Sequence, residues 1–308
     1  MRKSVPVADV RAPKEYLQGH IPHSVSMPLF ADEERAIIGT LYKQVGRDTA
    51  VEKGLEMVGP KLASFVTQAK QIAPDKRIIV HCWRGGMRSG SMAWLLSMAG
   101  FRVYLLEGGY KAFRKHFLGI LEQGLPQLKV LGGPTGSGKT ELLLQMQQNG
   151  HQVIDLEGLA HHKGSSFGAI NQAPQPTTEQ FENEVFTILS SFDLSQPIWV
   201  EDESKLIGTV HLPNALYKQM QQVPVYVVNI PLEKRIDRLV ADYTHCEKHL
   251  LEEALLRIKK RVGPQNVKAA QEALALNDFR TVAEIVLQYY DKAYAYGLQG
   301  REVVEWEG

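Results

Sequence analysis

The stretch RIIVHCWRGGMRSGSMAWLL, residues 77–96, is the most informative about the fold of the first part of the chain. It reads as a buried strand, a glycine-rich loop and a helix that ends at Gly100. Further predicted strands flank it, VPVADVR at 5–11 and FRVYLLEGG at 101–109, with helical patterns between them. Alternating strands and helices predict a parallel sheet, whose functional residues lie where strands end and helices begin.

Cys82 follows the central strand directly, in a loop with glycines at 85 and 86 and an arginine at 88. Loop amides and a helix N-terminus favour the thiolate form of a cysteine, and Arg84 and Arg88 add positive charge. We therefore predict a reactive thiolate, with Cys82, Arg84 and Arg88 as catalytic residues. An inert buried cysteine is the alternative, and it fits poorly with a basic, glycine-rich strand end.

A second loop, GPTGSGKT at 133–140, is a complete G-x-x-x-x-G-K-[ST] motif between a predicted strand, LKVLGG, and a predicted helix. Its glycines let backbone N–H groups face an anion, its lysine reaches terminal phosphates and its threonine can hold Mg²⁺. The cradle fits a diphosphate ester as well as a nucleotide. The predicted phosphate- or diphosphate-binding residues are Gly133, Pro134, Thr135, Gly136, Ser137, Gly138, Lys139 and Thr140.

Acidic and basic residues elsewhere in this half could act with the second loop. Two pairs of acids end the predicted strands HQVIDLEGLA (151–160) and PIWVEDES (197–204), and either pair could reach a metal or activate a water molecule. Helix capping or solvation explains them equally well. Two arginines in LEKRIDRL resemble those of a nucleotide-kinase lid, or are surface charges. These residues are Asp155, Glu157, Glu201, Asp202, Arg235 and Arg238.

The composition is that of a globular protein: 308 residues, 44% hydrophobic and 22% charged. The longest apolar runs are strand-sized and the N-terminus lacks a signal-peptide pattern, so we expect a cytoplasmic protein without a membrane span. Two distant cysteines, Cys82 and Cys246, are expected to be reduced. His161-His162 and the His245-Cys246-x-x-His249 segment lack the four ligands of a zinc site.

The pattern restarts near residues 117–127, so we predict domains at 1–118 and 126–308, the second becoming helical from about residue 247. Residues 1–125 carry 18 Lys and Arg against 11 Asp and Glu, whereas residues 126–308 carry 17 against 23. A basic domain could attract a polyanion, or the two halves could attract one another. Candidate contacts to a nucleic acid are Lys259, Lys260, Arg261, Arg47, Lys53, Lys61 and, for base stacking, Tyr289, Tyr290, Tyr294 and Tyr296.

The flanks of the cysteine loop resemble the rhodanese family. VADVRAPKEYLQGHIPHSVSMPL at 7–29 is similar to the rhodanese opening strand and helix, and VYLLEGGYKAF at 103–113 to the closing strand and turn. The loop itself matches the H-C-x-x-G-x-x-R-[ST] pattern of cysteine phosphatases and is one residue longer than the usual rhodanese loop. Rhodanese domains normally have a short strand and a helix before the D-x-R strand, whereas this chain begins almost on that strand. The matching residues are Asp9, Arg11, Gly19, His20, Ile21, Pro22, Glu107, Gly108 and Gly109.

A rhodanese-like domain followed by a P-loop domain resembles the bacterial tRNA 2-selenouridine synthase family. The resemblance includes stretches that neither fold requires in general: DEERAIIGTLYKQVG at 32–46, GGPTGSGKTELL at 132–143, DLEGLAHHKGSSFG at 155–168 and VEDES at 200–204. The resemblance implies an α/β fold: a rhodanese-like parallel-sheet domain with an insertion at about 31–60, then a P-loop NTPase-like α/β domain with a helical C-terminal region.

The same resemblance implies a transferase acting on the wobble uridine of tRNAs for Lys, Glu and Gln. It implies that 2-thiouridine is S-geranylated with geranyl diphosphate, and that selenium from selenophosphate then displaces the geranylthio group to give 2-selenouridine. Cys82 would carry selenium as a selenosulfide, the P-loop would bind the diphosphate with Mg²⁺, and a selenophosphate-producing enzyme could be a partner. The alternatives are a cysteine phosphatase or P-loop nucleotide kinase with an accessory rhodanese-like domain, and a P-loop regulatory module.

Overall fold

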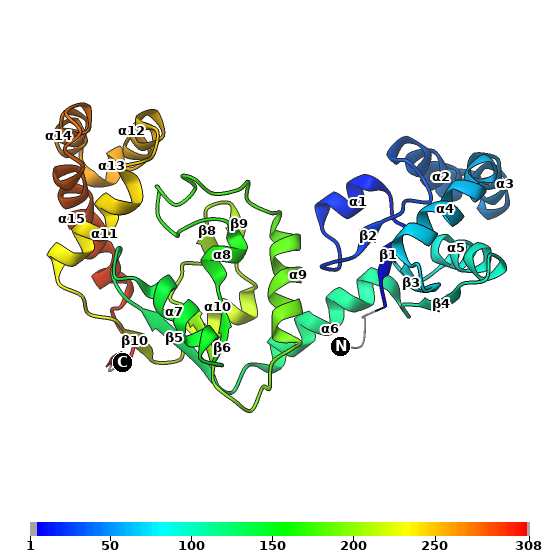
Figure 1. The fold of residues 1–308 in the computed structure, drawn as a ribbon, viewed down its shortest axis with the longest axis horizontal. Helices are drawn as coiled ribbons and strands as arrows, with labels where there is room; N and C mark the ends of the chain where they lie inside the picture. The colour runs from blue at the N-terminus through cyan, green and yellow to red at the C-terminus, as the bar shows by residue number, and fades with distance from the viewer. Residues whose placement is uncertain (1–4, 307–308) are drawn as a thin grey trace. The chain divides into compact units, whose positions relative to one another are not determined.

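The computed structural model describes residues 5–306 and divides the chain into two compact units, Met1–Gly119 and Ile120–Gly308 (Figure 1). The division lies inside one helix, α6 (Gly109–Gln123), where the sequence had indicated that the pattern restarts. The boundary between the two units therefore lies within a helix and not in a loop. Within the described residues, no helix combines the length and the apolar sequence needed to cross a membrane.

The first unit is a four-stranded parallel sheet in the order β2-β1-β3-β4 with helices packed against it. Its core consists of apolar side chains such as Met27, Phe65, Ile78 and Val80. The strands are β1 (Val7–Asp9), β2 (Val25–Ser26), β3 (Arg77–His81) and β4 (Arg102–Leu105), and the helices against them are α1 (Pro13–Gln18), α4 (Leu62–Ile72) and α5 (Met87–Met98).

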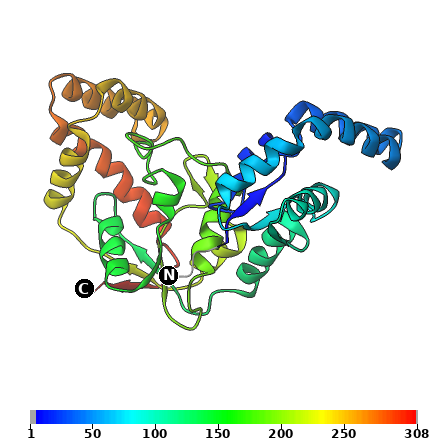
Figure 2. The ribbon, with the colours of Figure 1, turned by 45° about the vertical axis from the view of Figure 1, so that its right-hand side comes forward.

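The segment 31–60 forms a helix pair, α2 (Asp32–Gln44) and α3 (Arg47–Val58), followed by the short turn Gly59–Lys61. Gly46, at a φ of 144°, allows the sharp reversal between the two helices. Figure 2 shows the pair extending away from the strands of its unit. Each helix places most of its surface in solvent, which explains why the sequence shows only a loose helical period here.

The second unit has a five-stranded parallel sheet in the order β11-β10-β5-β7-β6. The two parallel sheets confirm the fold class expected from the sequence. One strand was not foreseen, because the C-terminal region is helical as far as Gly297 but ends in a strand that pairs with β10. The strands are β5 (Leu128–Gly132), β6 (Gln152–Ile154), β7 (Ile198–Glu201), β10 (Val225–Val227) and β11 (Val303–Glu305).

Helices surround this second sheet, and the last four pack around their own apolar cluster, which includes Leu251, Leu255 and Leu274. The predicted strand 151–160 is wrong in its second half, because Asp155 caps a short helix there, α8 (Leu156–Ala160). The other elements are α7 (Lys139–Gln148), α9 (Thr178–Leu189), α10 (Asn214–Met220), α11 (Leu232–Tyr243), α12 (Lys248–Arg257), α13 (Lys259–Val262), α14 (Pro264–Ala275), α15 (Phe279–Gly297) and the small hairpin β8 (Leu206–Ile207) with β9 (Val210–His211).

Candidate functional site

Cys82 lies immediately after β3, and the loop it begins ends at Gly86, where α5 starts. Its Sγ lies 3.2 Å from Ser89 Oγ, which also lies 3.1 Å from the Gly86 carbonyl oxygen, so the single hydroxyl proton can turn to the sulfur when the sulfur is a thiolate. Although burial raises the pKa of Cys82, the Ser89 hydroxyl and the backbone N–H groups of Ser89, Arg84 and Gly86 outweigh it and lower the pKa. The loop therefore stabilises a thiolate at this position.

The two arginines contribute differently from what the sequence indicated. Arg88 donates to the Glu15 carboxylate, at 2.5 Å from Nη1 and 3.2 Å from Nη2, so its charge is neutralised by α1. Burial raises the pKa of Glu15, but Arg88 and then Arg35 lower it overall. Arg84 is exposed and lines the cavity above the sulfur. The thiolate is thus held by amides and a hydroxyl, with the arginines beside the loop.

The turn after β4 supports the cysteine loop from below. Gly109 has a φ of 60°, and a Cβ there would lie 2.3 Å from the Cys82 carbonyl oxygen, so only glycine fits. The Tyr110 amide donates to the same carbonyl at 2.9 Å, and the Lys111 amide donates to Trp83 at 2.9 Å. This close approach gives a physical reason for the E-G-G sequence at 107–109.

The D-x-R pair of the first strand is structural. The Arg11 guanidinium binds both oxygens of Asp9, at 2.6 to 3.0 Å, and donates to the Gly19 carbonyl at 2.7 Å. It also stacks over the Tyr110 ring, with 3.8 Å to the ring centre. Both ionic side chains are almost fully buried. Their pairing fixes the end of α1 against the turn below the cysteine loop.

The P-loop connects β5 to α7 and borders a pocket of about 370 Å³. Lys139 Nζ donates to the Gly133 carbonyl at 2.9 Å, which keeps the ammonium group folded over the loop. Gly136 has a φ of 79°, and a Cβ there would lie 3.1 Å from the Arg235 carbonyl of α11. The tight fit between the loop and α11 therefore requires glycine at this position.

The two arginines expected at a lid instead bind the P-loop backbone. Arg235 is buried, with Nε donating to the Thr135 carbonyl at 2.9 Å and both terminal nitrogens on Asp291. Arg238 donates to the Gly136 carbonyl at 3.1 Å and pairs with Glu141 at 3.1 Å. By satisfying carbonyl oxygens, they leave the loop amides for an anion. Arg235 supports the loop and does not form a free lid.

The four predicted acids divide into two groups. Glu157 accepts a hydrogen bond from Thr140 at 3.0 Å, and Asp202 lines the pocket while pairing with Arg301 at 2.6 Å. Asp155 caps α8 through the Gly158 amide, and Glu201 is fully buried, accepting from the Leu156 amide at 2.8 Å. Burial, and then the nearby Asp155, raises the pKa of Glu201 well above its usual value. These last two residues do not line the phosphate pocket.

Sequence reasoning missed Glu203, which lines the pocket beside Glu157. Burial and then the Glu157 charge raise its pKa well above the usual value. Both carboxylates converge on Gly164, where a Cβ would lie 2.9 Å from oxygens of each. Glu203 lies in the VEDES segment, two residues beyond the end of β7, but the spacing of that segment does not distinguish Glu203 from the neighbouring acids. Among residues 5–306, no three His, Cys, Asp or Glu side chains group as a metal site would require.

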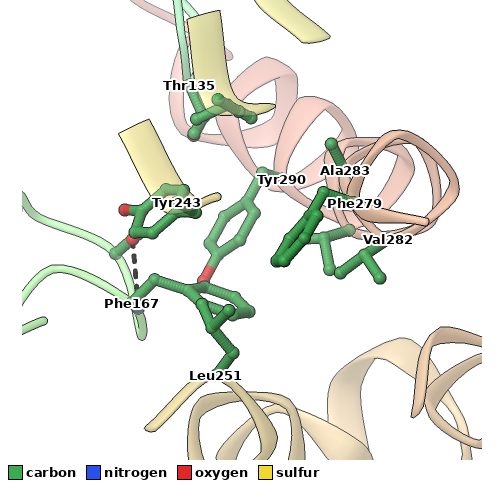
Figure 3. A pocket seen from close by; sticks show the side chains of 11 residues that line it. Thr135, Phe167, Tyr243, Leu251, Phe279, Val282, Ala283 and Tyr290 are labelled. Carbon is green, nitrogen blue, oxygen red and sulfur yellow. Dashed lines mark hydrogen bonds between the residues drawn. The ribbon is translucent and has the colours of Figure 1, made fainter. Parts of the chain in front are cut away.

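An apolar cavity of about 50 Å³ adjoins the P-loop pocket. Five residues line both: Thr135, Ser165, Leu239, Tyr243 and Tyr290. Figure 3 shows Tyr290 in the middle of the cavity, between Thr135 of the P-loop and Phe167. The Tyr290 hydroxyl accepts the Ser166 amide at 3.0 Å, which satisfies its polar end and leaves the ring facing the cavity. The remaining walls are Leu251, Phe279, Val282, Ala283 and Val286.

Some of the candidate nucleic-acid contacts are exposed, and others are paired with acids or packed in the second unit. Lys259, Lys260 and Arg261 are exposed on α13, whereas Lys53 and Lys61 pair with acids, Glu56 at 2.7 Å and Glu34 at 2.5 Å. Arg47 is exposed at the start of α3. Among the tyrosines, Tyr290 and Tyr294 line the P-loop pocket, Tyr289 packs against the C-terminal helical cluster and Tyr296 is exposed.

Comparisons with known proteins follow the same division of the chain. Residues 1–116 match the model of the rhodanese-like domain, and residues 126–304 match that of the tRNA 2-selenouridine synthase AAA domain. A solved structure, the N-terminal domain of a protein described as ATP/GTP binding from Clostridium difficile 630, is 45% identical. It covers 36% of this chain and 88% of that chain, with a TM-score of 0.35.

Curated relatives are similar over nearly the whole length. Proteins named tRNA 2-selenouridine synthase from Sulfurovum sp. and Shewanella frigidimarina are each 36% identical, covering 96% of this chain and 89% of each relative. The Nitrosomonas europaea protein of that name is 34% identical, covering 97% of this chain and 90% of its own. With both domain models in order and this coverage, the chain belongs to the tRNA 2-selenouridine synthase family.

Proposed function

We propose that the protein converts 2-thiouridine at the wobble position of tRNAs for Lys, Glu and Gln into 2-selenouridine, through S-geranyl-2-thiouridine. The observation that carries this proposal is the pairing of two anion-binding loops of different chemistry in one chain. One loop stabilises a thiolate at Cys82, and the other is a P-loop that shares walls with an apolar cavity. Geranyl diphosphate and selenophosphate are the proposed donors.

The first step belongs to the P-loop unit. The thiouridine sulfur attacks C1 of the geranyl group, the C1–O bond breaks, pyrophosphate leaves and the base loses its N3 proton. Residues 133–140 would hold the diphosphate, and donors aimed at developing negative charge on a leaving group accelerate such a step. The rings of Tyr243 and Tyr290 at the edge of the P-loop pocket would contact the first part of an apolar tail (Figure 3).

The residues present fit a Mg²⁺ ion at this site. Burial and then the charge of Glu157 raise the pKa of Glu203, and a divalent cation beside the two carboxylates would offset that repulsion. Mg²⁺ commonly uses one or two carboxylates together with substrate phosphates and water. Thr140 and Glu157 would hold the ion, which would neutralise charge on the departing pyrophosphate.

The second step belongs to the cysteine loop, and it balances without a redox partner. The Cys82 thiolate attacks C2 of the S-geranyl base and the C2–S bond breaks, releasing geranylthiol. Selenium of selenophosphate then attacks C2 and frees Cys82, and water cleaves the P–Se bond to give phosphate. A Cys82 selenosulfide, as the resemblance implies, would require removal of two electrons as the S–Se bond forms, so we assign Cys82 the role of nucleophile.

Reconstitution tests this proposal directly. The full-length protein is incubated with 2-thiouridine tRNA, geranyl diphosphate, selenophosphate and Mg²⁺, and the wobble nucleosides are identified by mass spectrometry. We expect S-geranyl-2-thiouridine when selenophosphate is omitted and 2-selenouridine when both donors are present. Unchanged 2-thiouridine, with phosphate released from an aryl phosphate, would instead support the cysteine-phosphatase alternative.

A further inference from the structure

The largest cavity at either loop lies above Cys82, with a volume of about 650 Å³. One wall is the cysteine loop itself, including Trp83 and Met87, and the opposite wall is the helix pair α2–α3. The wall residues are mainly apolar, and Phe30, Ile38, Val51 and Leu55 line the cavity together with Cys82. A phosphate-sized donor such as selenophosphate needs none of this apolar surface.

Large apolar side chains are exposed around this cavity. Tyr42 is 56% exposed, Leu55 67% and Met87 52%. Apolar surface left in water at the mouth of a pocket marks a binding site for an apolar group. The helix pair is fixed at its base, since Lys14 N donates to Asp32 at 2.9 Å and Lys61 pairs with Glu34 at 2.5 Å. The cavity is therefore a built feature of the first unit.

The chain leaves space open at the centre of α3. Gly54 is buried inside the helix, where glycine is less favourable than alanine. A Cβ at this position would meet Phe30 at 3.4 Å and Ile38 at 3.8 Å, which is ordinary contact, so backbone geometry does not demand glycine. A larger side chain would extend into the cavity that Gly54 lines.

The reaction locates the substrate in this space. The sulfur that leaves is bonded to C2, the carbon attacked at the cysteine loop, so the geranyl chain begins within a bond or two of the Cys82 sulfur. Cys82 is 3% exposed and lines this cavity. A cavity of about 150 Å³ is enough to hold benzene, and this one is several times larger. Its rim also carries Arg35, Lys43 and Arg84, which suit the tRNA backbone.

We propose that the apolar cavity between α2–α3 and the cysteine loop binds the geranyl chain of the tRNA intermediate while its C2–S bond is broken. This inference rests on the proposed function and adds a substrate site to it. The α2–α3 pair then determines which S-alkyl group the second step accepts.

The test measures the second step alone. The full-length protein receives selenophosphate and a tRNA anticodon stem-loop carrying either S-geranyl- or S-dimethylallyl-2-thiouridine, and kcat/KM for 2-selenouridine formation is compared. We expect the wild-type protein to prefer the geranyl substrate by about 100-fold, since burying additional methylenes in a pocket gives discrimination of this order. Leu55→Gln and Gly54→Leu should each reduce that preference about tenfold, mainly by slowing the geranyl substrate.

Leu17→Gln is the matched control, because Leu17 is 72% exposed on α1 in the same unit and does not line the cavity. It should leave the preference unchanged. Equal use of both substrates by the wild-type protein, or a preference unaltered in both cavity variants, would overturn the inference and leave the proposed function standing. Failure of the wild-type protein to convert either substrate would overturn both.

Discussion

The cysteine loop and the P-loop are built alike but hold their anions differently. Each follows a buried parallel strand and ends at a helix N-terminus. In the cysteine loop, amides and the Ser89 hydroxyl surround the sulfur of Cys82, a residue that is 3% exposed. In the P-loop, the amides border an open pocket of about 370 Å³. One loop surrounds an anionic side chain of the protein itself, and the other borders a pocket open to a ligand.

Arginine placement shows the same contrast. Arg88 of the cysteine loop binds Glu15, so its charge is balanced by that carboxylate. Arg235 and Arg238 instead bind carbonyl oxygens of the P-loop, which leaves its N–H groups for a ligand. The position of a guanidinium relative to a loop therefore determines whether it binds a neighbouring carboxylate or the loop backbone.

The largest expected effect is that of Cys82→Ser. If the two loops serve separate steps, this variant should lose at least about 10³-fold in 2-selenouridine formation, because a serine hydroxyl is not ionised at neutral pH. S-geranyl-2-thiouridine should accumulate, as measured by nucleoside mass spectrometry. Loss of geranylation in the same variant would mean that the division between the loops is wrong.

Lys139→Ala should give the opposite pattern. If Lys139 binds the proposed diphosphate, removing its ammonium group should slow geranylation by roughly 10²–10³-fold, the usual effect of losing one donor to developing charge. Selenation of a tRNA that already carries S-geranyl-2-thiouridine should proceed at the wild-type rate. A matching decrease in both steps would show that the loops act together.

Gly109→Ala tests whether the cysteine loop depends on the turn beneath it. The added Cβ would collide with the Cys82 carbonyl oxygen in a backbone conformation that alanine disfavours. We expect a loss of about 3 kcal/mol in the unfolding free energy of the first unit, combining backbone strain and overpacking. Thermal unfolding measures it, and Gly119→Ala, with open space around its Cβ, is the control. Equal stability of the two variants would contradict the close approach.

Ser89→Ala should have the smallest effect. The Ser89 hydroxyl is the largest of the interactions that lower the pKa of Cys82, so its loss raises that pKa. Thiolate forms as pH rises through the pKa, and the rising limb of the selenation rate should therefore move to higher pH. We expect about a tenfold slower reaction at neutral pH, with the wild-type rate recovered in alkaline buffer. An unshifted pH profile would assign thiolate stabilisation to the amides alone.

Strongly patterned segments of the sequence predicted their own structure. The strand before Cys82, the P-loop and the helix after it follow from periodicity and glycine spacing, and both sheets are parallel as alternation predicts. Short elements were beyond that reasoning. β11 has three residues, too few to show a period, and α8 depends on the capping side chain of Asp155.

Side-chain partners were harder to predict than backbone, because they join distant segments. Glu15 precedes Arg88 by 73 positions, and Asp291 follows Arg235 by 56. The sequence therefore indicated that these arginines lie near the loops but not which carboxylate each would bind. Glu203 has a similar explanation, since its role comes from its packing against Glu157.

The strand β11 has a consequence for how the molecule is made. The sheet of the first unit needs nothing beyond Leu105, so it can form while most of the chain is still being synthesised. The P-loop sheet acquires its last strand only with residues 303–305, and Asp202 acquires its partner only with Arg301. Ribosomal synthesis proceeds from the N-terminus, so the unit that carries Cys82 can fold while the unit that carries the P-loop is still incomplete.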